Sequence, residues 1–293
     1  MSGWDIADIP DQTGRTIIVT GANSGLGAAT ARALAGAGAQ VIMACRNEVK
    51  ARGVADRIGA GVQVRRLDLA DLASVREFAD GIDSADVLIN NAGVMAVPLK
   101  RTADGFEMQV GTNHLGHFAL TGLLLEKIRE RVVTVSSGMH AIGRIDIEDL
   151  NWERRNYQRW AAYGQSKLAN LMFTFELQRR LTAAGSPKLS VAAHPGYAAT
   201  DLQGHTESFQ DVFLSIGNRL FAQSAEMGAL PALFAATSEV EPGEFYGPTG
   251  LRGLRGHPGR SSSSAAARDE VTARRLWELS EQLTKVSFPF TRR

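Results

Sequence analysis

Short apolar runs alternate with longer amphipathic stretches along the first two thirds of the chain. The apolar runs are rich in β-branched and small residues and have the length of buried strands; they cover residues 16–19, 40–44, 62–67, 86–89, 131–135 and 189–193. Between them, apolar residues recur at helical spacing, over residues 25–37, 48–58, 72–82 and 161–182. This alternation predicts an α/β fold with one doubly wound parallel sheet and helices on both faces.

The alternation weakens after residue 196. We expect a loop and an amphipathic helix over 201–221, a further helix over 225–237 and a short strand over 244–246, which gives the sheet about seven strands. Residues 252–267 are rich in Gly, Arg and Ser, a composition that favours an irregular surface loop. A final helix is predicted over 268–285, where apolar side chains again recur at helical spacing.

The composition is that of an ordinary soluble globular protein. Of the 293 residues, 44% are hydrophobic and 22% are charged, and neither a repeat nor a linker divides them, so a single domain over 1–293 is predicted. A formal net charge of +1 gives no reason to expect a nucleic-acid partner. The single cysteine, Cys45, allows no intrachain disulfide. With no signal peptide and no apolar run of about 18 residues, we expect a cytoplasmic protein without a transmembrane segment.

A glycine-rich turn joins the first predicted strand to the first helix. It reads Thr20-Gly21-Ala22-Asn23-Ser24-Gly25-Leu26-Gly27. Unpaired backbone N–H groups and the positive end of the helix would converge there, and glycines allow an anion to approach the backbone closely. A dinucleotide pyrophosphate is the predicted ligand. The spacing differs from G-x-G-x-x-G, so a glycine-rich turn of any α/β protein remains the alternative for this motif alone.

Further candidate residues follow the other predicted strands or lie on the long helix. Ligands of a doubly wound sheet bind beyond the carboxyl ends of its strands. Tyr163 and Lys167 are four residues apart and therefore share one helix face. A nearby cation favours the phenolate and would bring the tyrosine pKa, ordinarily about 10, towards neutrality, where a phenol can exchange protons. Taken alone, such a pair is commonly a surface pair.

Taken in order, these motifs resemble those of the short-chain dehydrogenase/reductase family. The matching residues are Thr20-Gly21-x-x-x-Gly25-x-Gly27, Asn90-Asn91-Ala92-Gly93, Asn113, Ser137, Tyr163 with Lys167, and Pro195-Gly196. Other segments are similar to the retinol-dehydrogenase and protochlorophyllide-reductase-like branch, namely Ala44-Cys45-Arg46-Asn47, Asn113-His114-Leu115-Gly116-His117-Phe118, Ser166-Lys167-Leu168-Ala169-Asn170 and the long segment between Ser137 and Tyr163. The resemblance implies a Rossmann-type fold and, for this branch, bulky apolar substrates.

The resemblance also assigns catalytic roles. It implies that Tyr163 is the general acid/base and that Lys167 binds the nicotinamide ribose and lowers the pKa of Tyr163. Ser137 would hydrogen-bond the substrate oxygen, whereas Ser136 is expected to bond only backbone. Asn113 would hold a water that links Lys167 to solvent.

The same resemblance assigns a set of residues to the cofactor site. Asp68 and Leu69 would lie by the adenine, and Pro195, Gly196 and Thr200 beside the nicotinamide carboxamide. The full set implied to bind the cofactor is Gly21, Asn23, Ser24, Gly25, Leu26, Gly27, Arg46, Asp68, Leu69, Asn90, Ala92, Gly93, Tyr163, Lys167, Pro195, Gly196 and Thr200.

The residues after the second strand indicate which nicotinamide cofactor is used. NAD sites usually place a carboxylate there to accept hydrogen bonds from the ribose 2′-OH. This chain has Cys45 followed by Arg46, and a guanidinium can bind a 2′-phosphate with two N–H groups. We therefore predict NADP(H) in preference to NAD(H), with a solvated loop position for Arg46 as the alternative.

The predicted function is that of an NADP(H)-dependent oxidoreductase acting on CH–OH donors, which interconverts an apolar alcohol and its aldehyde or ketone. A segment over about 197–224 would cover the substrate. Its apolar residues are Tyr197, Leu202, Phe209, Val212, Phe213 and Phe221. They fit a lid over the substrate, the core or a dimer contact equally well. An NADP(H)-binding sensor without turnover and a purely structural interaction protein are the alternatives, but the complete set of Ser137, Tyr163 and Lys167 favours an enzyme.

The histidines bear on metal binding, and the long helices bear on association between copies of the chain. His114, His117 and His140 have no cysteine or carboxylate at metal-ligand spacing, so they are expected at polar helix or loop positions, and no metal site is predicted. His194 is expected to be structural. Family resemblance implies a homodimer or homotetramer that associates through exposed faces of the helices over 105–128 and 163–181, although a monomer is also compatible with the sequence.

Overall fold

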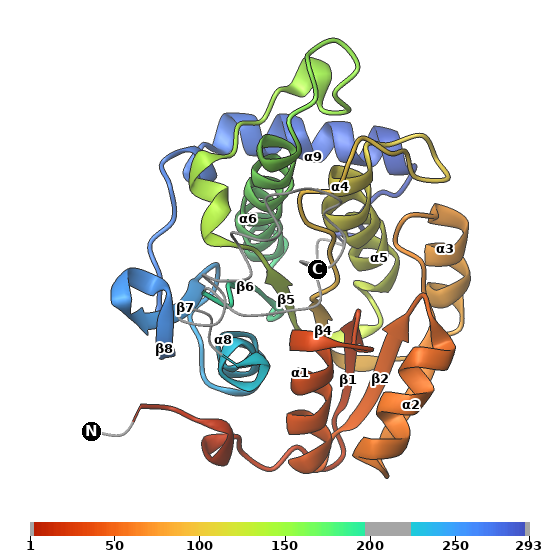
Figure 1. Cartoon of the computed structure of the whole chain (residues 1–293), viewed down its shortest axis with the longest axis vertical. Coiled ribbons are helices and arrows are strands. Elements are labelled where there is room, and N and C mark those ends of the chain that lie inside the picture. Colours follow the sequence, from red (N-terminus) through yellow and green to blue (C-terminus); the bar gives the residue numbers. More distant parts are fainter. Residues whose placement is uncertain (1–2, 197–223, 291–293) are drawn as a thin grey trace.

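The computed structural model describes residues 3–196 and 224–290, which contain one eight-stranded sheet in the order β3-β2-β1-β4-β5-β6-β7-β8 (Figure 1). The first seven strands are parallel, and β8 runs antiparallel to β7. Their bounds are β1 Thr16–Thr20, β2 Gln40–Cys45, β3 Val62–Arg66, β4 Ala85–Asn90, β5 Ile128–Val135, β6 Leu189–Ala193, β7 Phe245–Gly250 and β8 Arg255–Arg260. The predicted doubly wound sheet is confirmed, with eight strands in place of about seven.

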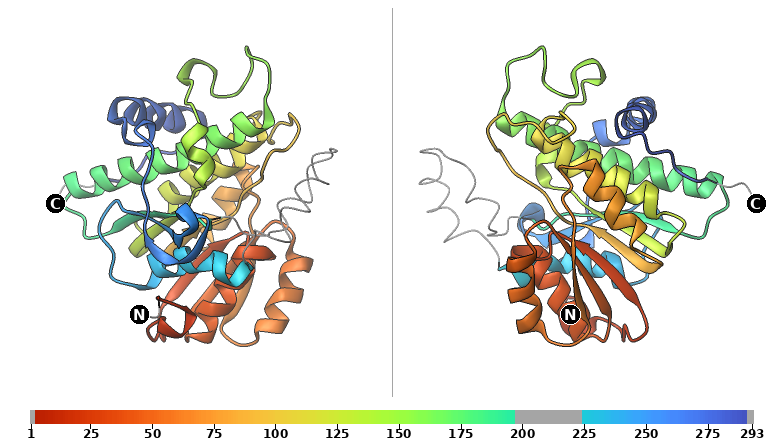
Figure 2. Two further views of the ribbon diagram at one scale, coloured as in Figure 1. Left: turned by 60° about the vertical axis from the view of Figure 1, so that its left-hand side comes forward. Right: turned by 90° about the vertical axis from the view of Figure 1, so that its right-hand side faces the viewer.

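Helices cover both faces of this sheet, α1, α2 and α8 on one face and α3, α5 and α6 on the other (Figures 1 and 2). Their bounds are α1 Gly25–Gly36, α2 Glu48–Ile58, α3 Leu72–Asp80, α4 Met108–Val110, α5 Gly116–Leu124, α6 Arg159–Ala183, α8 Ala225–Thr237 and α9 Glu270–Thr284. A π-helical turn, Gly111–Leu115, joins α4 to α5. Side-chain direction alternates along a strand, so Ile17 and Val19 enter the core under α1 whereas Ile18 enters the core under α5.

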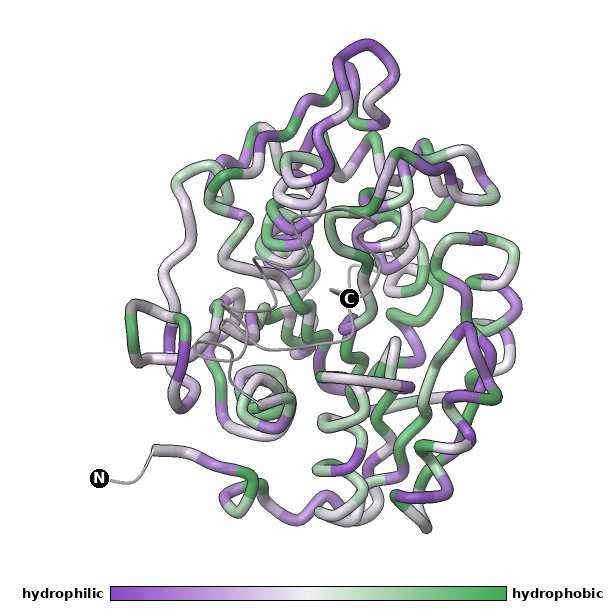
Figure 3. Tube along the Cα trace, viewed as in Figure 1, coloured by the Kyte–Doolittle hydropathy of each residue, from purple (hydrophilic) through white to green (hydrophobic). Residues whose placement is uncertain are grey.

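Local sequence signals set several helix ends. The side chain of Asn47 caps α2 by accepting the backbone N–H of Lys50 at 2.9 Å, and that of Asp71 caps α3 by accepting N–H groups from Ala73 and Ser74. Such caps satisfy donors that a helix start leaves unpaired. Figure 3 shows how hydrophobic and hydrophilic residues are distributed in the fold: apolar strands lie at the centre, and a hydrophilic loop protrudes between β5 and α6.

The stretch predicted as an irregular loop over 252–267 contains β8, so that prediction is wrong for its central part. Gly247 and Pro248 of β7 lie opposite Gly259 and Pro258 of β8. Proline and glycine weaken a strand and are confined mainly to sheet edges. Because β8 is the edge strand, it needs a hydrogen-bonded partner on one side only, and its glycines and proline are tolerated. The composition of the segment alone does not reveal this position in the sheet.

The long helices that were expected to mediate association are covered within the chain itself. Every residue of α6 from Ala162 to Gln178 is buried, as is nearly all of α5. The C-terminal helix α9 lies across them (Figures 1 and 2), and Trp277 of α9 packs on Phe118 and Phe173 with ring centres 5.0 and 5.8 Å apart. These helices therefore lack the exposed faces that the association hypothesis assumed. Within residues 3–196 and 224–290, no helix is both long enough and apolar enough to cross a membrane.

Candidate active site

The glycine turn lies at the carboxyl end of β1 and leads directly into α1. Gly21 has φ +67°, and a Cβ on it would come within 2.9 Å of the Ala92 backbone. A Cβ on Gly27 would lie 2.4 Å from the Gly21 carbonyl oxygen. Glycine is therefore required at both positions. The turn presents the first N–H groups of α1 to the cleft without side chains in front of them, which is the arrangement that binds phosphates.

Cys45 lies beneath this turn. Burial raises the pKa of its thiol to about 11, and the backbone N–H groups of Ala22 and Asn23 in the turn oppose this rise. Besides replacing a carboxylate, Cys45 therefore lies against the glycine turn.

A second turn, at the end of β4, is tied to the first. The hydroxyl of Thr20 accepts the backbone N–H groups of Asn91 and Ala92, both at 2.9 Å. The side-chain amide of Asn91 donates to the Thr20 carbonyl at 2.8 Å. The side chain of Asn90, which was predicted to line the cofactor, is fully buried and donates to Thr121 at 3.0 Å. Asn90 is not among the residues that line the cleft at these strand ends.

A cleft of about 380 Å³ runs along these strand ends. At one end it is lined by Arg46, Asn47 and Lys50 at the start of α2, and at the other by Gly93, Val94 and further residues near α4. The predicted cofactor residues that line it are Gly21, Asn23, Ser24, Gly25, Leu26, Gly27, Arg46, Asp68, Leu69, Ala92 and Gly93.

Tyr163 and Lys167 stand on one face of α6, as their spacing predicted. The Lys167 ammonium lies 5.8 Å from the centre of the Tyr163 ring. The Ser137 hydroxyl is close enough to the Tyr163 phenol to lower its pKa, and the two α6 side chains are only 6% and 4% exposed. Ser136 instead donates to the Lys167 backbone carbonyl at 2.8 Å. Ser137 is therefore the serine beside the phenol.

The expectation that Lys167 lowers the pKa of Tyr163 is not met. Burial raises the pKa of Tyr163 to about 12, and only the hydrogen bond with Ser137 opposes this rise. The Lys167 ammonium donates to the Val135 carbonyl at 3.1 Å, and burial lowers its pKa to about 8. Desolvation, which disfavours both charged forms, dominates here.

Asn113 lies in the π-helical turn between α4 and α5, next to Gly93. Its side-chain oxygen accepts the Val94 N–H at 2.8 Å, and its amide donates to the Val94 carbonyl and the Ser166 hydroxyl, both at 2.9 Å. A Cβ on Gly93 would lie 3.1 Å from that oxygen and 3.5 Å from the Lys167 nitrogen. The structure therefore brings the side chains of Asn113 and Lys167 together beside Gly93.

His194 directly follows β6 and contacts residues of two segments near this strand end. The buried His194 ring accepts the Gly196 N–H at 3.2 Å and contacts the Ser261 hydroxyl at 3.0 Å. Pro195 and Gly196 follow directly, and their place beside the nicotinamide stays a prediction. Thr200 and the apolar side chains of the predicted covering segment lie outside the described residues.

His140 is a residue that sequence reasoning missed. Its Nδ1 bonds the Ser137 carbonyl at 2.7 Å, and its Nε2 accepts the Ser264 N–H at 3.2 Å. It thereby holds the backbone of Ser137 against the segment after β8. His114, expected at a polar position, is also buried and contacts the Ser280 hydroxyl at 2.9 Å. Among the described residues, no group of three His, Cys, Asp or Glu side chains is arranged to hold a metal ion.

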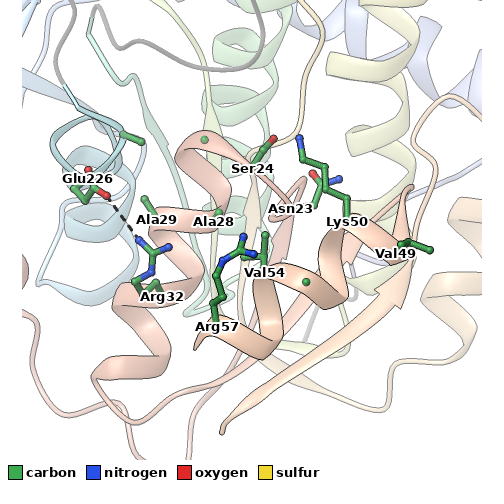
Figure 4. Close-up of a pocket in the computed structure, with 13 residues that line it drawn as sticks. Asn23, Ser24, Ala28, Ala29, Arg32, Val49, Lys50, Val54, Arg57 and Glu226 are labelled. Atoms are coloured by element: carbon green, nitrogen blue, oxygen red, sulfur yellow. Dashed lines mark ion pairs between the residues drawn. The ribbon is translucent and has the colours of Figure 1, made fainter. Parts of the chain in front are cut away.

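A larger hollow of about 530 Å³ lies between α1, α2 and α8 (Figure 4). Arg32 and Arg57 line it, and Arg32 forms a 3.7 Å ion pair with Glu226. It adjoins the cleft at Asn23 and Ser24. None of the predicted catalytic side chains lines it. The smaller cleft adjoins them through Gly93, which lines that cleft and where a Cβ would lie 3.1 Å from the Asn113 oxygen and 3.5 Å from the Lys167 nitrogen.

Comparison with known proteins adds three matches. The family model described as short chain dehydrogenase matches residues 15–211. Retinol dehydrogenase 13 of Homo sapiens is 43% identical over 297 residues, which cover 95% of this chain and 87% of that protein. The crystal structure of an uncharacterized protein from Mycobacterium paratuberculosis has a TM-score of 0.87 and 54% identity and covers 98% of this chain and 100% of that chain.

A structure described as an NAD(P)-dependent gluconate 5-dehydrogenase from Beutenbergia cavernae, with bound NADP, is more distant. Its TM-score is 0.64 and its identity 27%, with 80% of this chain and 96% of that chain covered.

Proposed function

The chain belongs to the short-chain dehydrogenase family and to its retinol-dehydrogenase-like branch, and on that premise we propose that it is an NADP(H)-dependent oxidoreductase that interconverts an apolar alcohol and its carbonyl compound. The observation that carries the proposal is the buried pair of Tyr163 and Lys167 on one face of α6, with the Ser137 hydroxyl close enough to the phenol to act on its pKa. A nucleotide-binding protein without turnover would not need this trio.

The cleft suits a nicotinamide dinucleotide. Glycines at 21 and 27 leave backbone N–H groups accessible at the start of α1, where a pyrophosphate would be held. A side chain at Gly93 would crowd Asn113 and Lys167, which supports a role for this glycine in admitting the nicotinamide end. When bound, the cofactor supplies the hydride.

Tyr163 would handle the proton. Because its pKa is raised to about 12, the phenol keeps its proton at neutral pH and can donate it to the substrate oxygen during reduction. Ser137, close to the phenol, would direct the same oxygen and stabilise the charge that develops on it. Lys167 would bind the nicotinamide ribose. In the reverse direction the Tyr163 phenolate, and not the phenol, would accept the proton of the alcohol.

The preference for NADP(H) rests on the start of α2. Cys45 leaves no carboxylate to repel a 2′-phosphate, and the exposed Arg46 lines the cleft. The structure from Beutenbergia cavernae that contains NADP shares this fold. An apolar substrate is supported by the similarity to retinol dehydrogenase 13.

The proposal is tested with the Tyr163→Phe variant. General acid catalysis contributes roughly 10²–10⁴-fold, so we expect NADPH-dependent reduction of a panel of apolar aldehydes and ketones to fall by at least about a hundredfold. NADPH binding, followed by fluorescence, should be retained.

Tyr246→Phe is the matched control, because the buried Tyr246 hydroxyl accepts the Glu241 N–H at 3.2 Å away from the cleft. It should leave turnover unchanged. Full activity of Tyr163→Phe would refute the assigned mechanism, and NADPH binding without turnover by the unmodified protein would favour the sensor.

A further inference from the structure

His117 on α5 connects the two turns of the cofactor cleft to Asn113. Its ring is 1% exposed. Nε2 lies 2.9 Å from the Thr20 hydroxyl, and Nδ1 lies 3.0 Å from the Asn113 backbone carbonyl. The sequence analysis expected only a polar helix position here.

The partners of His117 fix its tautomer. A carbonyl oxygen can only accept, so Nδ1 carries the hydrogen that is donated to Asn113, and Nε2 is left as an acceptor. The Thr20 hydroxyl must then donate to Nε2, which leaves its two lone pairs for the N–H groups of Asn91 and Ala92. The Ile89 carbonyl, 3.4 Å from the Thr20 hydroxyl, is a more distant acceptor than Nε2. The two ring nitrogens of His117 therefore have distinct roles, Nδ1 as donor and Nε2 as acceptor.

The charge state keeps this arrangement in place. Burial is the main cause that lowers the pKa of His117; the bond to Asn113 opposes the shift and the nearby Lys167 charge adds to it, so the pKa falls to about 4. The ring is therefore neutral at physiological pH, and both nitrogens keep the roles just assigned.

Both ends of the imidazole act on residues of the proposed site. Through Thr20, Nε2 holds Asn91 and Ala92, which line the cleft. Through Nδ1, the ring holds the carbonyl of Asn113, whose side chain is already fixed by Val94 and Ser166. The Asn113 oxygen and the Lys167 nitrogen both lie within 3.5 Å of where a Cβ on Gly93 would be.

We propose that His117 is a positioning residue with two separable functions: Nε2 orders the cofactor-binding turns through Thr20, and Nδ1 orders the catalytic end through Asn113. The second function rests on the oxidoreductase activity proposed above. The first concerns cofactor binding alone and is tested without turnover.

Two single substitutions separate the functions. In His117→Asn, the amide nitrogen takes the place of Nδ1 and keeps the bond to Asn113, but the side chain is too short to reach Thr20. We expect the Kd for NADPH to rise about tenfold, the value of one hydrogen bond, with kcat within threefold. In His117→Gln, the longer side chain accepts from Thr20 and leaves Asn113, so kcat should fall about tenfold while Kd is kept.

Two further variants control for a purely structural effect. Thr20→Val removes the hydroxyl with little change of shape and should reproduce the higher Kd of His117→Asn. His114→Gln alters another buried histidine, one that contacts Ser280 outside the cleft. It should lower the melting temperature and change neither Kd nor kcat.

Fluorescence titration gives Kd, steady-state kinetics gives kcat, and thermal melting gives stability. The proposal is overturned if both His117 variants change Kd and kcat by the same factor, or if they behave like His114→Gln. If the unmodified protein binds NADPH but does not turn over, the proposed function fails. The Kd comparison of His117→Asn with Thr20→Val then still decides the role of Nε2.

Discussion

The two ends of the cleft are built in opposite ways. At the catalytic end, Tyr163, Lys167 and Asn113 are buried, and the side chains of Lys167 and Asn113 are held by hydrogen bonds within the chain. At the other end, Arg46 between β2 and α2 and Lys50 on the first turn of α2 are exposed. Within the described part of the chain, the guanidinium of Arg46 forms no hydrogen bond or ion pair.

The difference shows what each end must do. Proton transfer needs groups fixed to within a fraction of an ångström, and a buried, hydrogen-bonded network supplies this at a cost in desolvation. Recognition of a phosphate at the surface needs only charge within reach, and a flexible arginine supplies it at little cost. Substitutions at the buried end should therefore alter both chemistry and stability, and those at the exposed end cofactor choice alone.

The largest effect is expected from Lys167→Met. Loss of the ammonium should lower NADPH-dependent turnover by about a hundredfold or more. Stability should rise, because the pKa of Lys167 falls from 10.5 to about 8 on burial, which corresponds to a cost of about 3 kcal/mol for the charged form near neutral pH. The Val135 carbonyl keeps a donor in Asn170, 3.2 Å away.

Thermal melting and steady-state kinetics on the same preparation measure both effects. Lys188→Met is the control. The Lys188 ammonium also donates to a backbone carbonyl, that of Leu125 at 2.6 Å, and neither residue lines the cleft. It should keep full activity. A melting temperature that falls together with activity in Lys167→Met would show that the buried lysine is a structural support.

Acid should destabilise the protein through histidines buried beside the catalytic end. Burial lowers the pKa of His114 to about 3 and those of His117 and His194 to about 4. The unfolded chain takes up protons on these side chains below about pH 6.5, whereas the folded chain does so only near pH 4. The free energy of unfolding should therefore fall as the pH falls from 6.5 to 4, by about 2 kcal/mol per histidine at pH 5.

Urea unfolding at pH 7 and pH 5 tests this expectation. His114→Gln removes one of the three groups and should reduce the loss of stability between these pH values by roughly a third. If the loss is the same in the variant, His114 does not contribute to the acid sensitivity.

The sequence predicted those parts of the fold and site that depend on local pattern. Apolar runs located the strands, and because the carboxyl ends of parallel strands share one edge, Gly21, Ala92 and Ser137 could be assigned to one cleft. The four-residue spacing of Tyr163 and Lys167 predicted their common face. These inferences need only periodicity and chain direction.

Other features depend on contacts between distant parts of the chain. Asn90 turns into the core because Thr121 on α5 offers it a partner, and nothing near Asn90 in the sequence signals this. The strand β8 forms because β7 leaves an edge open, and α9 covers α6 through Trp277. The direction of the Tyr163 pKa shift depends on how deeply the ring is buried, which a motif does not encode.

The smallest expected effect, and the one that isolates the exposed end, comes from Arg46→Ala. A charged hydrogen-bonded contact contributes about 1.5–3 kcal/mol, so the Kd for NADPH should rise roughly ten- to a hundredfold while the Kd for NADH stays the same. Because the Arg46 side chain is exposed, the free energy of unfolding should change by less than about 0.5 kcal/mol.

Arg52→Ala is the control. It removes an exposed arginine that is paired with Glu48 on α2 at 3.6 Å, and it should change neither Kd. Equal weakening of NADPH and NADH in Arg46→Ala would mean that Arg46 supports the turn and does not read the 2′-phosphate, and the contrast between the two ends would then fail.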